Sequence, residues 1–180
     1  MNKPIAKTYD PKEFETRIYD KWETGGGFKA DATSSKKPFV ISMPPPNATG
    51  QLHQGHAVML AIEDVLTRWH RMMGDEALWL PGTDHAAIAT ENVVLQKIKD
   101  EEGIENPRET LGRDEVLKRI MDYVEDSRGT IKSQVRAMGA SCDWSRERFT
   151  MDAQLNRCVN ETFQHMFDDG LIYRGYRIVN

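Results

Sequence analysis

Two histidines in the stretch PPPNATGQLHQGH, residues 44 to 56, are the clearest candidates for chemistry in this sequence. His53 and His56 lie three residues apart, so at the start of a helix both imidazoles can reach one ligand. Imidazole N–H groups can stabilise the negative charge that builds on a phosphoryl group during its transfer. The pair therefore predicts a phosphate-handling site, while chance occurrence or a purely structural histidine pair remains an alternative.

The second candidate is the stretch LPGTDHAA, residues 80 to 87. Asp84 could present its carboxylate to a small cation, such as the ammonium group of an amino acid. The same position would let Asp84 cap a helix that begins at His85, and local sequence alone favours the cap. A metal site on His53 and His56 would need a third ligand from Asp84 or His85, and no HExxH pattern supports one.

Both candidate stretches follow a predicted strand and precede a predicted helix. Residues 39 to 43 read as a short strand that the proline run ends, and residues 78 to 80 read as a second strand. Between them, residues 54 to 73 have helical periodicity. This βαβ order predicts a parallel α/β sheet, whose ligands bind at the carboxyl edge of the strands. Gly50 and Gly55 would let a ring or a phosphate approach the free backbone N–H groups of the helix start.

The residues before the first strand predict an N-terminal helical arm. Asp10 is the expected N-cap of a helix that ends at Gly25, with Phe14, Ile18 and Trp22 on one face. That face is expected to dock on the core. Residues 25 to 37 are rich in loop-forming residues, so we expect domain boundaries of 1–37 for the arm and loop and 38–180 for the sheet domain.

The apolar periodicity also predicts which face of each later helix is buried. Helices are expected from His85 to about 101, from about 114 to 138 and from about 152 to 169, and the last ten residues, LIYRGYRIVN, are expected to form a strand that turns at Gly175. The residues expected to be buried are Val58, Ile62, Val65, Trp69 and Met72 in the helix at 54–73, Val116, Ile120, Tyr123, Val124, Ile131 and Val135 in the long helix, and Leu155, Val159, Phe163 and Met166 in the last one.

The composition excludes several classes of protein. At 180 residues with 39% hydrophobic residues the chain can bury a core, and no apolar run approaches the roughly 18 residues of a membrane span. No secretory signal precedes residue 15, so a cytoplasmic protein is expected. Cys142 and Cys158 are too few for a disulfide framework and are expected to be reduced. The net charge of −4 neither proposes nor excludes an RNA partner.

Together these stretches resemble the class I aminoacyl-tRNA synthetases, and most closely their valine-tRNA ligases. PPPNATGQLHQGH resembles the proline-asparagine block that ends in the family's His-Ile-Gly-His signature, here residues 53 to 56. LWLPGTDHAAIATE resembles the second fingerprint, and GASCDWSRERFTMD with GLIYRGYRIVN resembles a third. The segment Gly-Thr-Asp-His-Ala resembles that of the valine enzymes, and the isoleucine and leucine enzymes are the near alternatives. The resemblance implies the first half of a Rossmann-like catalytic domain that stops before the family's editing insertion.

The resemblance also implies roles for individual residues. His53 and His56 would be the catalytic histidines that bind ATP and stabilise the transition state of adenylation. The valine pocket would include Pro44, Pro45, Asn47 and Asp84, the last holding the ammonium group. The ATP site would comprise Asn47, Thr49, Gly50, His53, Gly55 and His56.

The implied activity is ATP-dependent formation of valyl-adenylate and transfer of valine to the 3′ end of tRNA(Val). The partners are then valine, ATP with Mg²⁺ and the tRNA, with no tightly bound cofactor and a monomeric full-length enzyme. The chain differs from the residues that are common in the family at Ala48, Gln54, Ala87 and Glu91. The family's Lys-Met-Ser-Lys-Ser loop, editing domain and anticodon-binding helices do not occur in it. A truncated paralogue that binds a nucleotide or a tRNA end without chemistry is the alternative function.

Overall fold

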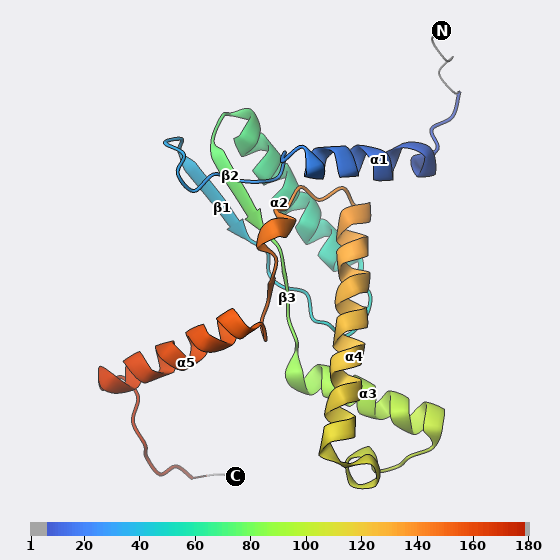
Figure 1. The fold of residues 1–180 in the computed structure, drawn as a ribbon, viewed down its shortest axis with the longest axis vertical. Coiled ribbons are helices and arrows are strands. Elements are labelled where there is room, and N and C mark those ends of the chain that lie inside the picture. Colours follow the sequence, from blue (N-terminus) through green and yellow to red (C-terminus); the bar gives the residue numbers. More distant parts are fainter. Residues whose placement is uncertain (1–6, 179–180) are drawn as a thin grey trace.

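The predicted βαβ unit is present in the computed structural model, which describes residues 7–178. Strands β1 (Pro38–Ser42) and β2 (Glu76–Leu80) pair in parallel, and helix α2 (Gln54–Met72) connects them (Figure 1). Ile41 pairs with Trp79, and the backbone N–H of Met43 extends the ladder by donating to Leu80 O at 3.0 Å. The α/β prediction is therefore confirmed.

A second, very short parallel pair continues from the end of β2. Strand β3 (Gly82–Thr83) pairs with strand β4 (Arg148–Phe149). Close approach explains the glycine, since a Cβ on Gly82 would lie 3.2 Å from Arg148 O. These pairs bring the segment around residue 149 to the end of the second strand, a contact that no local pattern predicts.

The remaining helices lie close to their expected bounds except for the long helix, which begins at Pro107 instead of near 114, and the 3₁₀ turn, which the sequence did not predict. They are α1 (Pro11–Thr24), α3 (Ala87–Glu102), α4 (Pro107–Ala137), the 3₁₀ turn η1 (Trp144–Arg146) and α5 (Ala153–Asp168). The long helix α4 has a break at Gly112, whose φ of 78° is left-handed. It stays helical through Gly129. None of the helices formed by residues 7–178 is both long and apolar enough to cross a membrane.

The core forms where α2 and α4 pack around the two strands. Its larger cluster comprises Met43, Leu60, Trp79, Ile131, Val135, Ala140 and Cys142. A smaller cluster comprises Ala48, Val124 and Phe149, with Ile120 packed against it. Through Ala48 it includes part of the first candidate stretch. The buried positions expected in α4 are confirmed at Val116, Val124, Ile131 and Val135. Burial raises the pKa of the Cys142 thiol to about 12, so this free cysteine is an inert core residue.

Helix α1 docks through a residue that the periodicity did not select. Tyr19 is buried, whereas Trp22 of the predicted face is 43% exposed. The Tyr19 hydroxyl donates to Ala140 O and accepts from Trp144 Nε1, both at 2.7 Å. These hydrogen bonds satisfy a buried hydroxyl, which explains why a tyrosine rather than the apolar row faces the core.

Helix α2 buries the opposite face from the predicted one. The five apolar residues expected in the core, Val58, Ile62, Val65, Trp69 and Met72, are between 53% and 86% exposed. The buried residues of α2 are Leu60 and Thr67. We call the five exposed residues the α2 stripe. The prediction was wrong because periodicity identifies an apolar row without identifying what covers it, and strands β1 and β2 lie on the other side of the helix.

The buried side of α2 also carries polar groups that are hydrogen-bonded to the strands and to the segment after α4. Glu63 accepts from the indole N–H of Trp79 at 2.8 Å, and Asp64 accepts from the backbone N–H of Ser141 at 3.0 Å. Arg71 donates to Ser141 Oγ at 2.6 Å and to Ser141 O at 2.9 Å. These groups are paired, so a face that reads as solvent-exposed can be buried without an unsatisfied charge.

Helix α5 extends away from the sheet and buries none of its side chains (Figure 1). Val159 and Phe163, expected in the core, are about two-thirds exposed at 66% and 65%, and Met166 is 38% exposed. The expected final strand is not formed in residues 171–178, and residues 179–180 lie outside the described part of the chain. Both predictions fail for the same reason, because neither segment has a neighbouring element to pack against or to pair with.

Candidate functional site

His53 and His56 meet at the N-terminus of α2, as predicted. His53 is the N-cap and has extended backbone geometry, while His56 lies in the first helical turn. The Gly55 N–H donates to His53 Nδ1 at 3.0 Å, and the His53 N–H donates to His56 Nδ1 at 3.2 Å. Because both Nδ1 atoms accept, the proton of each neutral ring is on Nε2. The two rings, 3.9 Å apart between centroids, therefore offer a pair of N–H donors at a helix N-terminus.

The protonation of His56 is biased by its surroundings. Desolvation by burial, followed by the nearby His53, lowers the pKa of His56 below its ordinary value. Both effects disfavour the imidazolium form, so at neutral pH His56 is a neutral donor rather than a cation. An arriving phosphate would then meet N–H dipoles and the positive end of α2.

Gly55 is required by the histidine pair itself. A Cβ at this position would lie 2.9 Å from His53 Cε1 and 3.0 Å from His53 Nδ1. Such distances are shorter than carbon atoms tolerate, so the His53 ring would have to move. The sequence expected a glycine here for the approach of ATP, and the structure adds that it makes room for a neighbouring side chain.

The loop before α2 is held from the side by α4. Tyr123 donates its hydroxyl proton to Thr49 O at 2.9 Å, and Gln134 accepts from the Leu52 N–H at 2.8 Å. Gly50 has a φ of 142°, which is in the left-handed region that favours glycine. Sequence reasoning missed the roles of Tyr123 and Gln134, since both lie far along the chain and on a helix that reads as structural.

The loops that follow β1 and β2 converge, as the sequence predicted. The Asp84 N–H donates to Pro46 O at 2.8 Å, and the Ala48 N–H donates to Asp84 O at 2.7 Å. Asn47 and Asp84 thereby form an isolated parallel bridge. Pro44, Pro45 and Asn47 are exposed beside it. Two segments that carry candidate amino-acid ligands thus lie in fixed register.

Asp84 does not cap the following helix in the expected way. Helix α3 begins at Ala87, and its N-cap is Ala86, which has a left-handed φ of 50° and no side-chain cap. The Asp84 carboxylate lies before the helix, where its Oδ1 accepts from the Ala86 N–H at 3.2 Å. The side chain is one-third exposed at 33%. The prediction of a cap is wrong because the chain turns at Ala86 before the helix starts.

Thr150, which lies outside both candidate stretches, forms further hydrogen bonds with Asp84 and His85. Thr150 donates its hydroxyl proton to Asp84 Oδ1 at 3.0 Å and accepts from the His85 N–H at 2.9 Å. Its Oγ1 also lies 2.5 Å from His85 Nδ1. Thr150 lies in the segment GASCDWSRERFTMD of the third fingerprint, but the sequence predicted no role for it. No spacing rule could have found it, because it is brought in by the pairing of β3 with β4.

Arg128 of α4 contacts the residues on both sides of this hydrogen-bond network. Its Nε donates to Thr83 Oγ1 at 3.1 Å, and its guanidinium lies 4.2 Å from the ring centre of Phe149. A further guanidinium N–H donates to Glu147 Oε1 at 3.2 Å. This planar cation therefore joins β3 to the segment that carries Thr150.

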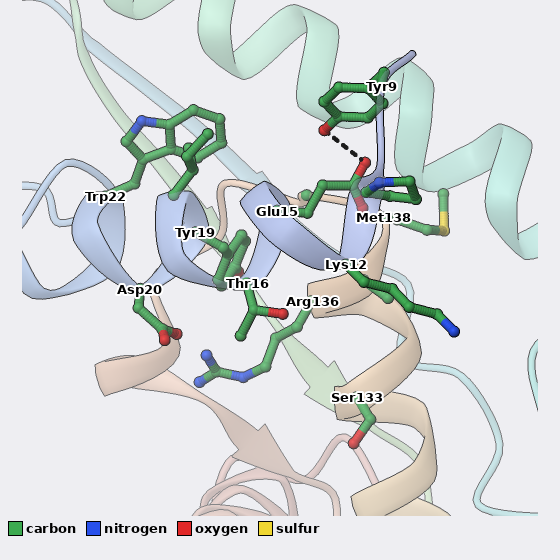
Figure 2. A pocket seen from close by; sticks show the side chains of 14 residues that line it. Tyr9, Lys12, Glu15, Thr16, Tyr19, Asp20, Trp22, Ser133, Arg136 and Met138 are labelled. Atoms are coloured by element: carbon green, nitrogen blue, oxygen red, sulfur yellow. Dashed lines mark hydrogen bonds between the residues drawn. The ribbon is translucent and has the colours of Figure 1, made fainter. Parts of the chain in front are cut away.

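A cavity elsewhere in the molecule does not coincide with these residues. It has a volume of about 600 Å³ and lies between α1 and the end of α4, lined by Tyr19, Trp22 and Arg136 among others (Figure 2). None of the candidate site residues lines it. Across residues 7–178 no three His, Cys, Asp or Glu side chains gather where they could hold a metal ion, so the metal alternative for His53 and His56 gains no third ligand.

Comparison with known proteins gives consistent matches over nearly the whole chain. The family model described as tRNA synthetases class I (I, L, M and V) matches residues 17–180. A valine-tRNA ligase of Chlamydia trachomatis serovar L2 is 51% identical over 176 residues, which are 98% of this chain and 18% of that protein. A valine-tRNA ligase of Geobacter sulfurreducens is 47% identical, covering 99% of this chain and 20% of that protein.

A solved structure has the same fold. The chain superimposes with a TM-score of 0.75 and 22% identity on the LeuRS of a ternary complex, Agrobacterium radiobacter K84 agnB2 LeuRS-tRNA-LeuAMS. The match covers 93% of this chain and 19% of that one. The chain thus spans about a fifth of the length of the proteins that it resembles.

Proposed function

The chain belongs to the class I tRNA synthetases (I, L, M and V), and from this premise we propose that it forms the first half of the catalytic domain of a valine-tRNA ligase. The complete enzyme would join valine to ATP, release pyrophosphate, and transfer valine from the adenylate to the terminal ribose of tRNA(Val). Relatives near 50% identity, all named valine-tRNA ligase, support valine over isoleucine or leucine. The division into an arm, 1–37, and a domain from 38 onward is part of the proposal, as are a monomeric enzyme and a cytoplasmic location.

The proposed ATP site is the N-terminus of α2. The Nε2–H groups of His53 and His56 would donate to phosphate oxygens and stabilise the charge that develops as the bond to pyrophosphate breaks. Asn47, Thr49 and Gly50 would contact the nucleotide from the preceding loop. Mg²⁺ would arrive with ATP and neutralise the leaving phosphates.

The proposed valine site is the exposed surface beside the Asn47 and Asp84 bridge. Pro44 and Pro45 would form a rigid apolar wall, because their rings carry no N–H and have fixed φ. Asp84 would accept the ammonium group, and Asn47 would lie between the two substrates. A pocket of this type separates valine poorly from threonine, a limit for which valine-tRNA ligases are themselves a well-known example.

The observation that carries the proposal is the pair of backbone hydrogen bonds between the loops after β1 and β2. They bring the candidate phosphate ligands and the candidate ammonium ligand to one edge of the sheet. Adenylation needs the valine carboxylate next to the α-phosphate, so two ligand sets at one edge favour it. The exposed α2 stripe fits the same proposal, since a longer enzyme has further elements to cover it.

The test is amino-acid-dependent exchange of pyrophosphate into ATP by the complete protein. Valine should support exchange far better than isoleucine or leucine. His56→Ala should lower the exchange rate by about 10²-fold or more, since it removes one donor to the developing charge. Asp84→Ala should raise the KM for valine while the KM for ATP changes little.

Two exposed residues provide matched controls. His165→Ala on α5 and Asp100→Ala on α3 repeat the same chemical changes away from the proposed site, and both should leave exchange unchanged. Normal exchange in both His56→Ala and Asp84→Ala would refute the site assignment. Nucleotide or tRNA-end binding without any exchange would favour the non-catalytic alternative.

A further inference from the structure

Thr150 occupies a position that the proposed function leaves without a role. Its hydroxyl oxygen contacts three groups of the loop after β3: the Asp84 carboxylate, the His85 N–H and the His85 ring. It is half-buried and lies one residue beyond β4. The backbone fixes it, because the Thr150 N–H donates to Thr83 O at 3.2 Å.

The protons of this network can be assigned from its chemistry. An ionised carboxylate only accepts, so the proton between Thr150 Oγ1 and Asp84 Oδ1 comes from the threonine. A hydroxyl has one proton, so the 2.5 Å contact with His85 needs a proton on His85 Nδ1. Thr150 therefore receives two hydrogen bonds from His85 and passes one to Asp84.

This arrangement sets the direction of the Asp84 carboxylate. Its Oδ1 accepts from Thr150 and from the Ala86 N–H, while Oδ2 has no hydrogen-bond partner among the described residues. One oxygen is thus held and the other is left toward solvent. A carboxylate anchored through one oxygen loses less rotational freedom when a cation binds to the other.

Thr150 also gives the His85 ring a closer acceptor than Asp84. His85 Nδ1 lies 3.4 Å from Asp84 Oδ1 but only 2.5 Å from the threonine hydroxyl oxygen. Without the hydroxyl, the Nδ1–H would lose its acceptor, and the nearest replacement is the Asp84 carboxylate. His85 would then compete with any ammonium group for the same carboxylate.

We propose that Thr150 is a positioning residue, which holds the Asp84 carboxylate and provides the His85 ring with a separate acceptor, so that Asp84 can bind the ammonium group of the substrate. The inference rests on the proposed amino-acid activation and names a residue that the family match leaves unassigned. Thr150 itself does not touch the substrate in this scheme. Its effect is confined to ammonium binding, so ATP binding should be unaffected.

The test measures pyrophosphate exchange by the complete protein with Thr150→Val and Thr150→Ala. Both remove the hydroxyl, and only the first keeps the shape of the side chain. Each should raise the KM for valine about tenfold or more while the KM for ATP stays within about twofold, as expected for a lost hydrogen bond to a charged group. Thr150→Ser retains the hydroxyl and should stay within about threefold of wild type for valine.

Two analogues give a readout that a merely structural role would not move. Valinol keeps the ammonium group, and its inhibition constant should rise in Thr150→Val by the same factor as the KM for valine. 3-Methylbutanoate lacks the ammonium group, and its inhibition constant should be the same in both proteins. Thr130→Val, the same change at an exposed threonine on α4, is the control and should behave as wild type.

The outcomes separate this inference from the proposed function. Wild-type protein without valine-dependent exchange would overturn both. Normal wild-type exchange with an unchanged valine KM in Thr150→Val and Thr150→Ala would overturn the positioning role alone. Equal rises in the KM for valine and for ATP, or equal weakening of valinol and 3-methylbutanoate, would also overturn it, since they would indicate a general distortion of the site.

Discussion

Replacement of Gly55 by alanine tests the histidine pair through a contact of known length. The added methyl would lie 2.9 Å from His53 Cε1, and an ordinary contact begins at 3.4 Å, so the ring must retreat by about 0.5 Å. The retreat breaks the 3.0 Å bond from the Gly55 N–H to His53 Nδ1, which caps α2. Loss of an N-cap costs about 1 kcal/mol, while alanine gains about 0.5–1 kcal/mol over glycine within a helix.

These opposing terms leave the stability of α2 within about 1 kcal/mol of wild type. Activity should respond much more strongly, because a donor displaced by a fraction of an ångström no longer meets the phosphate. We expect the rate of valine-dependent pyrophosphate exchange to fall about 10²-fold. Amide hydrogen exchange of residues 54–60 in the complete protein measures the local stability in parallel.

Gly129→Ala is the matched control. Gly129 lies within α4, and a methyl group added there would meet no atom within 4 Å, so alanine should stabilise that helix by about 0.5–1 kcal/mol and leave activity unchanged. Gly55→Ala with a wild-type exchange rate would refute the reasoning. A loss of activity accompanied by loss of protection along the whole of α2 would equally refute it, because the defect would then be unfolding.

Further predictions concern His56, Tyr19 and Ala86. His56 should titrate below the ordinary histidine pKa in an NMR titration, and His53→Ala should shift it only partly back, since burial is the larger cause. Burial raises the pKa of Tyr19 to about 12 from 10.0, so the fold favours the protonated hydroxyl. The contribution of Tyr19 to the docking of α1 should therefore be complete below pH 10 and be lost between pH 10 and about 12. Amide exchange or proteolysis of residues 11–24 would follow this loss. Tyr19→Phe should weaken that docking already at pH 7, by about 1–3 kcal/mol, because the Ala140 carbonyl and the Trp144 N–H lose their buried partner. Ala86→Gly should relieve the left-handed φ of 50° and stabilise the start of α3 by about 0.5 kcal/mol, measured by amide exchange of residues 87–92, and a loss of protection there would contradict the strain.

Local sequence determined α1, β1, α2 and β2 and the loops between them. Asp10, Pro11 and Gly25 bound α1, and the proline run with Gly50 ends β1 and leads to the cap of α2 at His53. Caps, prolines and glycines act over a few residues, so their effects can be predicted without knowing the fold. The same locality explains why His53 and His56, three residues apart, could be predicted to meet.

The convergence of the two loops could also be predicted, because it depends on topology rather than on individual contacts. A parallel βαβ unit brings the carboxyl ends of β1 and β2 to one edge, which places Asn47 beside Asp84. The roles that Asn47, Asp84 and the histidines perform toward substrates remain proposals. Their positions follow from the sheet.

Only the tertiary structure decided which faces are covered and which distant groups complete the corner at Asp84. Hydrophobic periodicity marked the α2 stripe, yet the strands pack on the opposite side of that helix, where paired polar groups lie beside Leu60. Thr150 reaches Asp84 across 66 positions through the pairing of β3 with β4. A sequence pattern records the periodicity of one segment, whereas burial and long-range hydrogen bonds depend on what a second segment places against it.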